Sequence, residues 1–464
     1  MSQTLHFDPA LIQRLSILGP RYTSYPTADR FHSSFTESDF DHLAKPLFQD
    51  AGQSRPLSLY VHIPFCNTLC YFCACNKIIT KDTTKAEQYV RYLNKELLLQ
   101  APLFQKTARV EQLHFGGGTP TFLGETLLTQ VMNDLKRTFH FVSDDKGEYS
   151  IEIDPRKVQP STMHLLRTLG FNRISLGVQD FNPIVQKAVN RVQSESGTRS
   201  IIKAAKDAGF KSISLDLIYG LPHQTPDTFA QTLEQVIELR PHRLSIYNYA
   251  HLPHRVKAQR RIEEKDLPTA DQKLDILALT IRMLANAGYV YIGMDHFALP
   301  DDELAIAQRA GTLHRNFQGY STHGDLDLLS FGVSAISKIG ASYSQNSRTL
   351  EEYYALLDQD RLPLFRGIEL NRDDQLRRQL IQRLMCHFQI DLPVFETEWD
   401  ISFANYFNVE MPTLHEYQTL GLLEFTSDTF RVMPKGRLLV RNIAMVFDRY
   451  LREQEKTARY SKVI

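Results

Sequence analysis

Four of the five cysteines in this 464-residue chain lie close together, at Cys66, Cys70, Cys73 and Cys75. Iron–sulfur clusters are held by thiolates, and spacers of three and two residues let one loop place the first three sulfurs around a [4Fe–4S] cubane. Three thiolates leave one iron without a protein ligand, so a substrate or cofactor can coordinate there. The spacing therefore predicts that Cys66, Cys70 and Cys73 hold an open [4Fe–4S] cluster.

Two other uses of clustered thiols compete with the cluster. A structural zinc site usually joins two separated ligand pairs, and the sequence shows no second Cys/His pair at a standard spacing. A thioredoxin-type C-x-x-C motif would use Cys70 and Cys73 but would leave two thiols unexplained. The extra thiol, Cys75, is idle, helps to assemble the cluster or donates hydrogen in radical chemistry. Cys386 lies in the apolar helical pattern LIQRLMCHF and is expected to be a buried core thiol.

The composition excludes several classes of protein. Hydrophobic residues make up 42% and charged residues 23%, as in a globular protein with a substantial core. Lysine plus arginine equals aspartate plus glutamate at 53 each, so no global field directs the chain to nucleic acid or to a membrane. The sequence shows neither a signal peptide nor an apolar run of roughly 18 residues. A cytoplasmic protein is expected.

From about residue 55 the chain alternates apolar runs rich in β-formers with amphipathic helical patterns such as AEQYVRYLNKELLLQ. The predicted strands are Leu57–Ile63, Val110–Phe115, Tyr149–Ile153, Arg173–Val178, Ser212–Ile218 and Arg243–Tyr249. Six strands separated by helices imply a parallel sheet with right-handed crossovers. Because eight strands are needed for a closed barrel of this kind, we expect an α/β fold with a partial (β/α)6 barrel.

The unusual residues follow these strands, where chemistry gathers in parallel α/β folds. The segments at the six strand ends are HIPFC, GGGTPT, EIDP, SLGVQDF, DLIYGLP and YNYAHLP. GGGTPT lacks the Gly-Lys-Ser/Thr of a phosphate loop, so it is a tight turn or a place where a ligand approaches the backbone. Glu152 and Asp216 at strand ends could cap a strand, form a salt bridge or accept hydrogen bonds from a ligand.

Three regions are expected along the chain. Residues 1–54 form an N-terminal arm with little periodicity, which we expect to fold across the barrel mouth. Residues 55–345 form the catalytic barrel with accessory elements. Residues 346–464 form a mainly helical domain whose tail reads as helix, short hairpin, helix, like a winged helix. Such units bind DNA or serve in packing, and the lack of a dense basic stripe favours packing.

CNTLCYFC resembles the C-x-x-x-C-x-φ-C signature of radical S-adenosylmethionine enzymes. A wider set of segments is similar to the family of oxygen-independent coproporphyrinogen III oxidases, also called coproporphyrinogen dehydrogenases. The segments that carry this resemblance are YVHIPFCNTLCYFCAC, LHFGGGTPT, EIDPR, SLGVQDF, NYAHLP, IGMDHFA, HRNFQGY and FGVSAISKIG. The resemblance spans nearly the whole chain, from GPRYTSYPTA to KGRLLVRNI.

The resemblance implies the cofactors and the residues that bind them. S-adenosylmethionine would coordinate the open iron, and the family accommodates two such molecules. The residues implied to contact it are Tyr60, Phe72, Gly117, Gly118, Thr119, Glu152, Gln179, Arg191, Asp216, Ala250 and Ile336. Phe317 and Gln318 match positions near the second molecule. Phe72, between two ligand cysteines, stacks on adenine or shields the cluster from water.

The resemblance also implies the reaction, an anaerobic oxidative decarboxylation of two propionates of coproporphyrinogen III to vinyl groups, which yields protoporphyrinogen IX in haem biosynthesis. It favours a catalytic role for Cys75. Because propionates need directional cationic donors, Arg21 in the arm is the candidate for binding them, unless it is an ordinary surface charge. The expected partners are an electron donor such as flavodoxin and a further electron acceptor. A monomer that binds neither nucleic acid nor membrane is expected.

A haem-binding chaperone of the same superfamily is the main alternative. Such relatives typically lack the fourth cysteine and the arm, and they carry a His-Asn-x-x-Tyr-Trp motif. In HRNFQGYST, Arg315 separates His314 from Asn316, and Ser321 follows Tyr320. The sequence therefore favours the oxidase.

Overall fold

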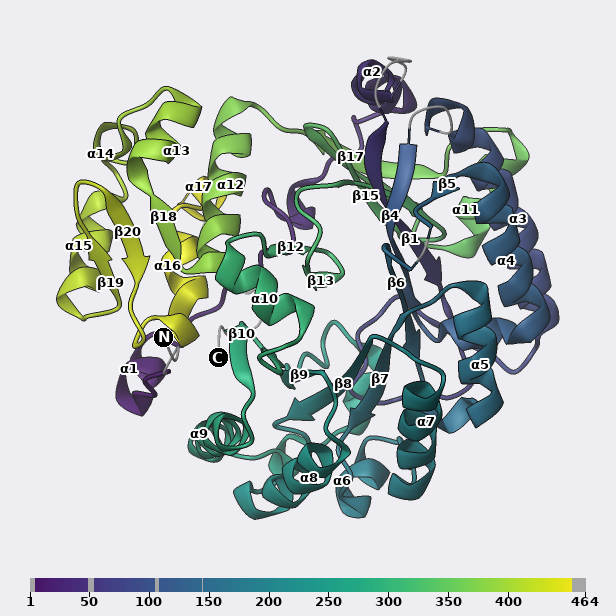
Figure 1. Cartoon of the computed structure of the whole chain (residues 1–464), viewed down its shortest axis with the longest axis horizontal. Coiled ribbons are helices and arrows are strands. Elements are labelled where there is room, and N and C mark those ends of the chain that lie inside the picture. The colour runs from purple at the N-terminus through teal and green to yellow at the C-terminus, as the bar shows by residue number, and fades with distance from the viewer. Residues whose placement is uncertain (1–4, 49–53, 105–107, 144, 453–464) are drawn as a thin grey trace. The chain divides into compact units, whose positions relative to one another are not determined.

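The computed structural model describes residues 5–48, 54–104, 108–143 and 145–452 (Figure 1). The chain forms two compact units, each discontinuous in sequence. The first, here called the barrel unit, comprises Phe31–Thr269 and Asp325–Glu369. The second, here called the terminal unit, comprises Met1–Arg30, Ala270–Gly324 and Leu370–Ile464. Packing thus divides the chain differently from the contiguous regions 1–54, 55–345 and 346–464, and the boundary at 345 falls inside a strand of the barrel unit. As a functional division, those regions stay a prediction.

A parallel sheet built from the six predicted strands forms the centre of the barrel unit. These strands are β1 (Arg55–Ile63), β4 (Ala108–Gly117), β6 (Glu148–Ile153), β7 (Arg173–Gln179), β8 (Ser212–Tyr219) and β9 (Arg243–Asn248). They are hydrogen-bonded neighbours in that order, and all are parallel. The predicted parallel sheet of six strands is confirmed.

Strands from the later part of the chain extend this sheet beyond β1. They are β14 (Asp327–Phe331), β15 (Ile336–Ile339), β16 (Ser342–Asn346) and β17 (Leu364–Glu369). β14 is parallel to β1, and the following three pairings are antiparallel. The short β5 (His140–Phe141) pairs with β4. The sequence did not predict this extension, because these strands carry Ser, Gln and Asn rather than uninterrupted apolar runs.

Helices cover the outer side of the sheet (Figure 1). They include α2 (Glu37–Phe48), α3 (Thr84–Phe104), α4 (Gly124–Thr138), α5 (Pro160–Leu169), α6 (Pro183–Ala188), α7 (Glu195–Asp207), α8 (Pro226–Leu239) and α11 (Leu350–Asp358). Gly170 ends α5 with φ 104°, and Gly209 follows α7 with φ 77°, so both glycines adopt the left-handed conformation that commonly ends a helix.

Side chains alternate along each strand between the helix-facing core and the interior of the barrel. Leu57, Leu59 and Val61 of β1 are fully buried, as the helix-facing side requires. The intervening residues include Tyr60 and His62, which therefore share the opposite face of the sheet. This period of two directs polar side chains into the barrel interior.

The terminal unit combines helices with short hairpins. Its helices are α1 (Pro9–Arg14), α9 (Ala270–Asn286), α10 (Glu303–Ala310), α12 (Arg372–His387), α13 (Leu392–Trp399), α14 (Phe403–Tyr406), α15 (Met411–Thr419), α16 (Val440–Val446) and α17 (Arg449–Arg452). Its strands are β10 (Val290–Gly293), β11 (His296–Ala298), β12 (His314–Asn316), β13 (Gly319–Ser321), β18 (Gln389–Asp391), β19 (Leu423–Phe425) and β20 (Thr429–Val432). The tail forms α15, the β19–β20 hairpin and α16, as predicted. Cys386 is 1% exposed, which confirms a core thiol.

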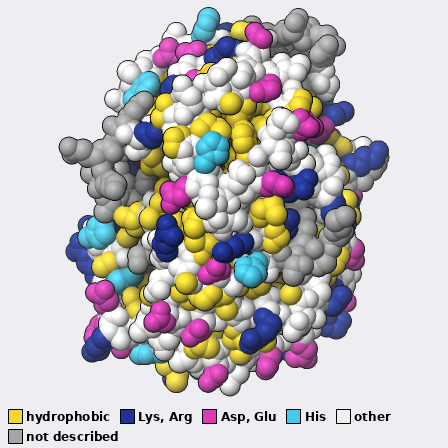
Figure 2. Space-filling view, turned by 90° about the vertical axis from the view of Figure 1, so that its left-hand side faces the viewer, with side chains coloured by type: hydrophobic (Ala, Val, Ile, Leu, Met, Phe, Trp, Pro, Cys, Tyr) yellow, Lys and Arg dark blue, Asp and Glu magenta, His cyan; other side chains and the backbone are white. Residues whose placement is uncertain are grey.

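Figure 2 shows basic, acidic and histidine side chains interspersed with hydrophobic ones over one face of the molecule. The DNA-binding alternative gains no support from this mixed face, because non-specific DNA binding needs clustered cations. Among the described residues, no helix is both long and apolar enough to cross a bilayer.

The N-terminal arm is divided between the two units. In the terminal unit, the Tyr22 hydroxyl donates to Asp448 Oδ2 at 3.0 Å, and Asn442 Nδ2 donates to the Leu15 carbonyl at 2.8 Å. In the barrel unit, His32 and Gly367 pair through their backbones. The predicted single element therefore anchors in two places, and its course across the barrel mouth stays a prediction.

Candidate functional site

The cysteines lie on a loop that begins where β1 ends. β2 (Phe65–Cys66) pairs in parallel with β3 (Ile78–Ile79) and closes this cluster loop at its base. The Ile78 N–H donates to the Pro64 carbonyl at 2.7 Å. Cys70 is buried, Cys66 and Cys73 are half-buried, and Cys75 is exposed. One short closed loop thus presents all four thiols.

Hydrogen-bond donors face the loop sulfurs. Arg191 Nη1 lies 3.5 Å and Arg156 Nη2 3.7 Å from the Cys70 sulfur, and Thr119 Oγ1 donates to the Cys66 sulfur at 3.4 Å. Donors and cations stabilise thiolates and the anionic clusters that thiolates hold. Burial raises the pKa of Cys66 to about 11, so metal binding at this thiol displaces a proton.

The three thiols are not arranged around a single ion. Among the described residues, no group of three or more His, Cys, Asp or Glu side chains is placed to hold one metal ion. A cubane does not require that arrangement, because each thiolate binds a different iron. The chemistry of the donor set, with three thiols on one loop and cationic donors beside them, fits a [4Fe–4S] cluster.

The glycine-rich turn after β4 packs against the entrance to the cluster loop. Gly118 N–H donates to the Ile63 carbonyl and Thr119 N–H to the Phe65 carbonyl, both at 2.8 Å. Gly117 has φ 110°, and a Cβ there would lie 2.6 Å from the His62 ring. A Cβ on Gly118 would lie 2.8 Å from the Pro64 carbonyl oxygen. Close packing of backbone on backbone therefore explains these glycines, whether or not a ligand also approaches them.

Two carboxylates at strand ends have opposite pKa shifts. Glu152 accepts hydrogen bonds from His114 Nε2 at 3.2 Å and from the Gly117 N–H at 3.3 Å. Burial opposes ionisation of Glu152, but these donors outweigh it and lower its pKa. Asp216 accepts from Ser175 Oγ at 2.9 Å, and burial, aided by repulsion from Glu152, raises the pKa of Asp216 to about 6. Among the described residues, neither carboxylate forms an ion pair with a lysine or arginine, so both suit a polar ligand.

Three buried polar atoms near the strand ends have no hydrogen-bond partner among the described residues. They are Gln179 Oε1, Arg191 Nε and Asn248 Oδ1. Gln179 also has φ 70°, a conformation that costs energy for a residue other than glycine. Buried polar groups are nearly always hydrogen-bonded, so this group indicates room for a ligand that completes it.

The structure reveals two positioning residues that the sequence did not identify. His62 bonds to the Tyr60 hydroxyl through Nδ1 at 3.0 Å and to the Asn76 carbonyl through Nε2 at 3.1 Å. Because a carbonyl only accepts, Nε2 carries the proton and the Tyr60 hydroxyl donates to Nδ1. Gln259, 2% exposed, donates through Nε2 to the carbonyls of Phe72 at 3.0 Å and Ala250 at 3.1 Å. Strand alternation from Tyr60 could have indicated His62, whereas no pattern indicates Gln259.

The predicted site residues divide between the units. The barrel unit contains the four loop cysteines and all the residues implied for the first S-adenosylmethionine, including Ile336 at the start of β15. The terminal unit contains Arg21, Phe317 and Gln318. Phe317 and Gln318 form the turn between β12 and β13, and Arg21 forms an ion pair with Asp295. The site described above therefore does not include these three.

Two family models match the chain. Residues 60–236 match the radical SAM superfamily, and residues 370–439 match the HemN C-terminal domain. The first match covers the cluster loop and most of the parallel sheet.

Curated relatives match the chain over its full length. An oxygen-independent coproporphyrinogen III oxidase of Pseudomonas aeruginosa is 52% identical over 100% of both chains. The enzyme of that name from Escherichia coli is 50% identical over 100% of this chain and 99% of its own. A solved structure described as coproporphyrinogen III oxidase (HemN) from Escherichia coli, a radical SAM enzyme, superposes with a TM-score of 0.91 and 49% identity, covering 96% of this chain and 100% of that one.

Proposed function

Because the chain belongs to the family of oxygen-independent coproporphyrinogen III oxidases, in the radical SAM superfamily, we propose that it converts coproporphyrinogen III to protoporphyrinogen IX. Two propionate side chains would be oxidatively decarboxylated to vinyl groups without oxygen. Full-length identity of 52% carries this proposal, and the donor-lined cysteine loop supports it.

Cys66, Cys70 and Cys73 would hold the [4Fe–4S] cluster, with S-adenosylmethionine at the open iron. Bound together, cluster and cofactor supply a carbon-centred radical that abstracts hydrogen from the substrate. Arg156 and Arg191 would offset the negative charge of the cluster through their contacts with the Cys70 sulfur.

The side chains at the strand ends would bind and orient S-adenosylmethionine. Glu152 and Asp216 would accept hydrogen bonds from its ammonium and ribose hydroxyl groups, while Gln179 and Arg191 would use their unpaired buried atoms. Other expected contacts come from Tyr60, Phe72, Gly117, Gly118, Thr119, Ala250 and Ile336. Gln259 would fix the positions of Phe72 and Ala250 relative to each other, since it donates hydrogen bonds to the backbone carbonyls of both. We assign Phe317 and Gln318 to a second cofactor molecule.

Cys75 and Arg21 are the proposed substrate-side residues. Cys75 is exposed, so its thiol is accessible for hydrogen donation during the radical reaction. Arg21 is paired with Asp295, so a propionate would replace one carboxylate partner by another. Such an exchange keeps the guanidinium hydrogen-bonded and therefore has a small electrostatic cost.

The remaining assignments concern partners and location. We propose a cytoplasmic monomer whose cluster takes electrons from a carrier such as flavodoxin, while a further acceptor takes the electrons removed from the substrate. The monomer would bind neither nucleic acid nor membrane. Free cysteines suit a reducing compartment. The haem-chaperone alternative is disfavoured by the full-length likeness to the oxidases and by the sequence HRNFQGYST.

The test is anaerobic reconstitution with iron and sulfide, followed by S-adenosylmethionine, a reductant, an electron acceptor and coproporphyrinogen III. Vinyl product together with deoxyadenosine is expected. Deoxyadenosine without vinyl product from a fully loaded protein would reject the substrate, and stable haem binding without turnover would favour the chaperone.

A further inference from the structure

Two segments of the barrel unit cover one side of the cluster loop. The first is α6 with the residues after it, where the Val189 carbonyl accepts from the Tyr71 N–H at 3.0 Å and Asn190 Nδ2 donates to the Leu69 carbonyl at 2.7 Å. The second is the 3-10 helix η4 (Lys257–Arg261), where Gln259 bonds to the Phe72 carbonyl at 3.0 Å. Outward side chains of these segments therefore form protein surface close to the cluster.

Both segments pack on the same apolar core. Val185 and Val189 of the first segment and Ile262 after the second are buried together, and Tyr71 and Phe72 of the cluster loop pack against them. This shared core fixes the two segments beside each other and beside the loop.

Two aliphatic side chains on the first segment face solvent. Ile184 is 64% and Val192 63% exposed. Single exposed aliphatic residues are common, but here they flank a segment that supports the cluster loop. Ile184 and Lys187 are three residues apart on α6, so they share a helix face.

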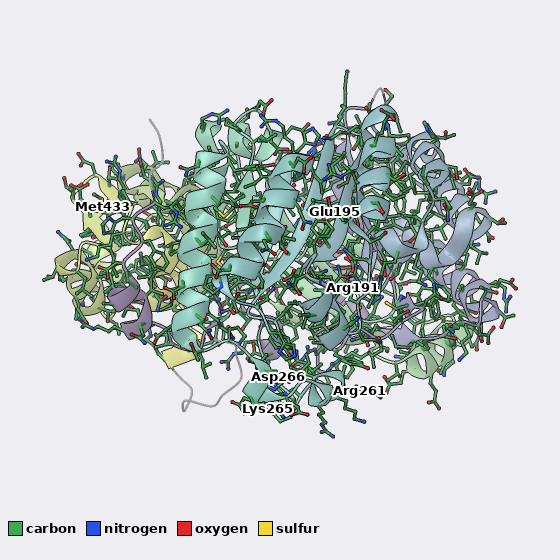
Figure 3. All side chains as sticks on the ribbon, turned by 90° about the horizontal axis from the view of Figure 1, so that it is seen from below. Arg191, Glu195, Arg261, Lys265, Asp266 and Met433 are labelled. Atoms are coloured by element: carbon green, nitrogen blue, oxygen red, sulfur yellow. The ribbon has the colours of Figure 1, made fainter. Side chains whose placement is uncertain are left out.

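Both segments also carry exposed cations. Lys187, Lys257, Arg260 and Arg261 are exposed, and residues 254–261 contain no aspartate or glutamate. The Arg261 guanidinium lies 5.3 Å from the centre of the Tyr71 ring, and its Nη1 lies 3.4 Å from the Tyr71 hydroxyl. Figure 3 shows Arg261 with Lys265 and Asp266 at the margin of the molecule in that view. The positive surface is thus in direct contact with the cluster loop.

We propose that Ile184, Lys187, Val192, Lys257, Arg260 and Arg261, here called the donor face, dock an acidic one-electron carrier protein that reduces the cluster. The proposal rests on the proposed function, since it requires a cluster. In the transfer the carrier loses one electron and the cluster gains one, with no bond formed or broken at the docking surface. Because electron transfer slows steeply with distance, a carrier has to dock beside the loop.

The charge distribution supports this occupant. The chain has no net charge, so only a local patch can steer an acidic partner. Arginine, which contributes two residues to the donor face, is enriched at protein interfaces. The substrate is a less suitable occupant, because side chains more than 60% exposed form an outward surface, whereas a tetrapyrrole needs enclosure.

The test compares two reductants on reconstituted full-length protein. Reduced flavodoxin is the acidic protein donor, and titanium(III) citrate is the small reductant that needs no docking surface. The variant Lys187→Glu/Lys257→Glu reverses two charges and leaves the hydrogen bonds that Asn190, Gln259 and Arg261 make with the loop in place. We expect deoxyadenosine formation to fall about tenfold or more with flavodoxin and to stay unchanged with titanium(III) citrate.

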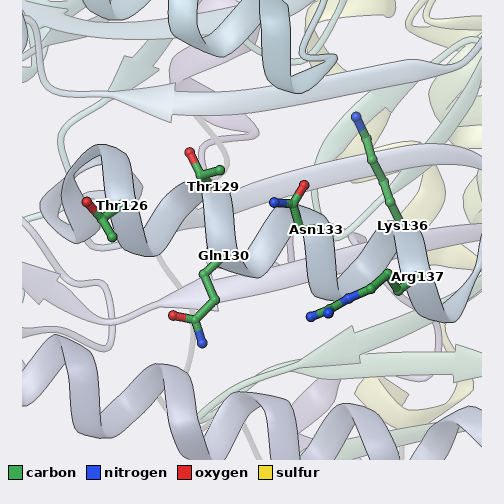
Figure 4. A pocket seen from close by; sticks show the side chains of 6 residues that line it. All are labelled: Thr126, Thr129, Gln130, Asn133, Lys136 and Arg137. Carbon is green, nitrogen blue, oxygen red and sulfur yellow. The ribbon is translucent and has the colours of Figure 1, made fainter.

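A matched control reverses two other exposed charges, in Arg137→Glu/Lys203→Glu. Both side chains are 76% exposed. Arg137 lies at the C-terminal end of α4, as Figure 4 shows, and Lys203 lies on the last turns of α7. These helices run antiparallel to the strands, so both residues lie toward the amino-terminal ends of the strands. The cluster loop lies at the opposite, carboxyl-terminal ends. The control should retain the native rate with both reductants.

Two further measurements sharpen the result. The native rate with flavodoxin should fall as ionic strength rises from roughly 0.05 to 0.5 M, and this dependence should be weaker in Lys187→Glu/Lys257→Glu. Ile184→Ser should raise the KM for flavodoxin without changing the salt dependence.

Native flavodoxin-dependent rates in the charge-reversal variant would overturn the proposal. Equal losses with both reductants would also overturn it, by showing that the face serves the substrate or the cofactor. Failure of the proposed function has a different signature, since the native protein would then form no vinyl product with either reductant.

Discussion

The buried carboxylate of Glu96 on α3 accepts as many hydrogen bonds as it can. In contrast, the buried side-chain amide oxygens at the ends of β7 and β9 have no hydrogen-bond partner among the described residues. Glu96 Oε2 accepts from the Tyr353 hydroxyl at 2.6 Å and the Gly332 N–H at 2.7 Å. Its Oε1 accepts from Asn346 Nδ2 at 2.6 Å and Gln100 Nε2 at 3.1 Å. Burial raises the pKa of Glu96 to about 7, and the four donors limit that rise.

The contrast separates buried polar groups that are fully hydrogen-bonded from buried polar groups that we propose to bind a ligand. The Glu96 network joins α3 to β16, α11 and the turn after β14, so its function is to fix the sheet extension. The side-chain amide oxygens of Gln179 and Asn248 have no hydrogen-bond partner among the described residues, so they link no elements of the fold. A substitution in the first region should therefore change stability, and one in the second should change ligand binding.

Removal of a cluster thiolate should have the largest effect on the ligand region. Cys66→Ala should abolish the cluster absorbance and the formation of deoxyadenosine, because two remaining thiolates do not hold a cubane firmly. Iron and sulfide content after anaerobic reconstitution measure the loss. Cys386→Ala is the control, since that thiol is buried in the terminal unit and should cost only about 1 kcal/mol of stability. A Cys66→Ala protein with full cluster and activity would refute the ligand assignment.

Glu96→Gln should have the largest effect on stability. The glutamine side chain has only one accepting oxygen. Its NH2 group would therefore face two of the four donors, and these two donors would lose their acceptor. We expect a loss of about 3 kcal/mol in unfolding free energy at about pH 8, where Glu96 is ionised. Urea unfolding measures it.

Tyr92→Phe is the matched control for Glu96→Gln on the same helix. It removes the exposed hydrogen bond to Asp358 and should cost less than about 1 kcal/mol. Equal losses in the two variants would remove the distinction between a saturated buried network and an ordinary surface bond.

The affinity for S-adenosylmethionine should depend on pH through Asp216. Its pKa is raised from 3.8 to about 6, and only the carboxylate accepts hydrogen bonds from the ligand on both oxygens. Affinity should be full above about pH 7 and about tenfold weaker at about pH 5, because protonation removes the binding form. Calorimetric titration of reconstituted protein measures this, with visible absorbance confirming an intact cluster. Asp216→Asn should bind weakly with a flat pH profile, and a flat native profile would contradict the assignment.

Gln179→Met should have the smallest effect of these substitutions, and its result distinguishes a ligand-binding residue from a structural one. Methionine keeps the length of the side chain and removes the unpaired oxygen, so stability should change by less than about 0.5 kcal/mol. Affinity for S-adenosylmethionine should fall by up to about tenfold, the value of one hydrogen bond. Lower stability with unchanged affinity would place Gln179 with Glu96 as a structural residue.

The central sheet was largely predictable because each of its strands carries a local signal. Buried parallel strands are apolar runs, and the helices between them show a 3.6-residue period, so the six strands and their parallel direction followed from pattern alone. The extension from β14 to β17 was missed, because its buried serine, glutamine and asparagine are satisfied by partners distant in sequence, as Asn346 is by Glu96. The two places where the arm is anchored were not predicted for the same reason, since Asn442 and Gly367 are distant from it in sequence.

The sequence by itself determined the thiol spacing, the strand-end placement of the polar residues and the resemblance that identifies the family. Those features are local in the chain or recur at fixed offsets. Only the tertiary structure showed that His62 binds Tyr60 through a defined tautomer, that Gln259 joins Phe72 to Ala250, and which buried atoms of the described residues have no hydrogen-bond partner. Whether a buried polar atom has a partner depends on residues brought together by folding, and no spacing along the chain records that.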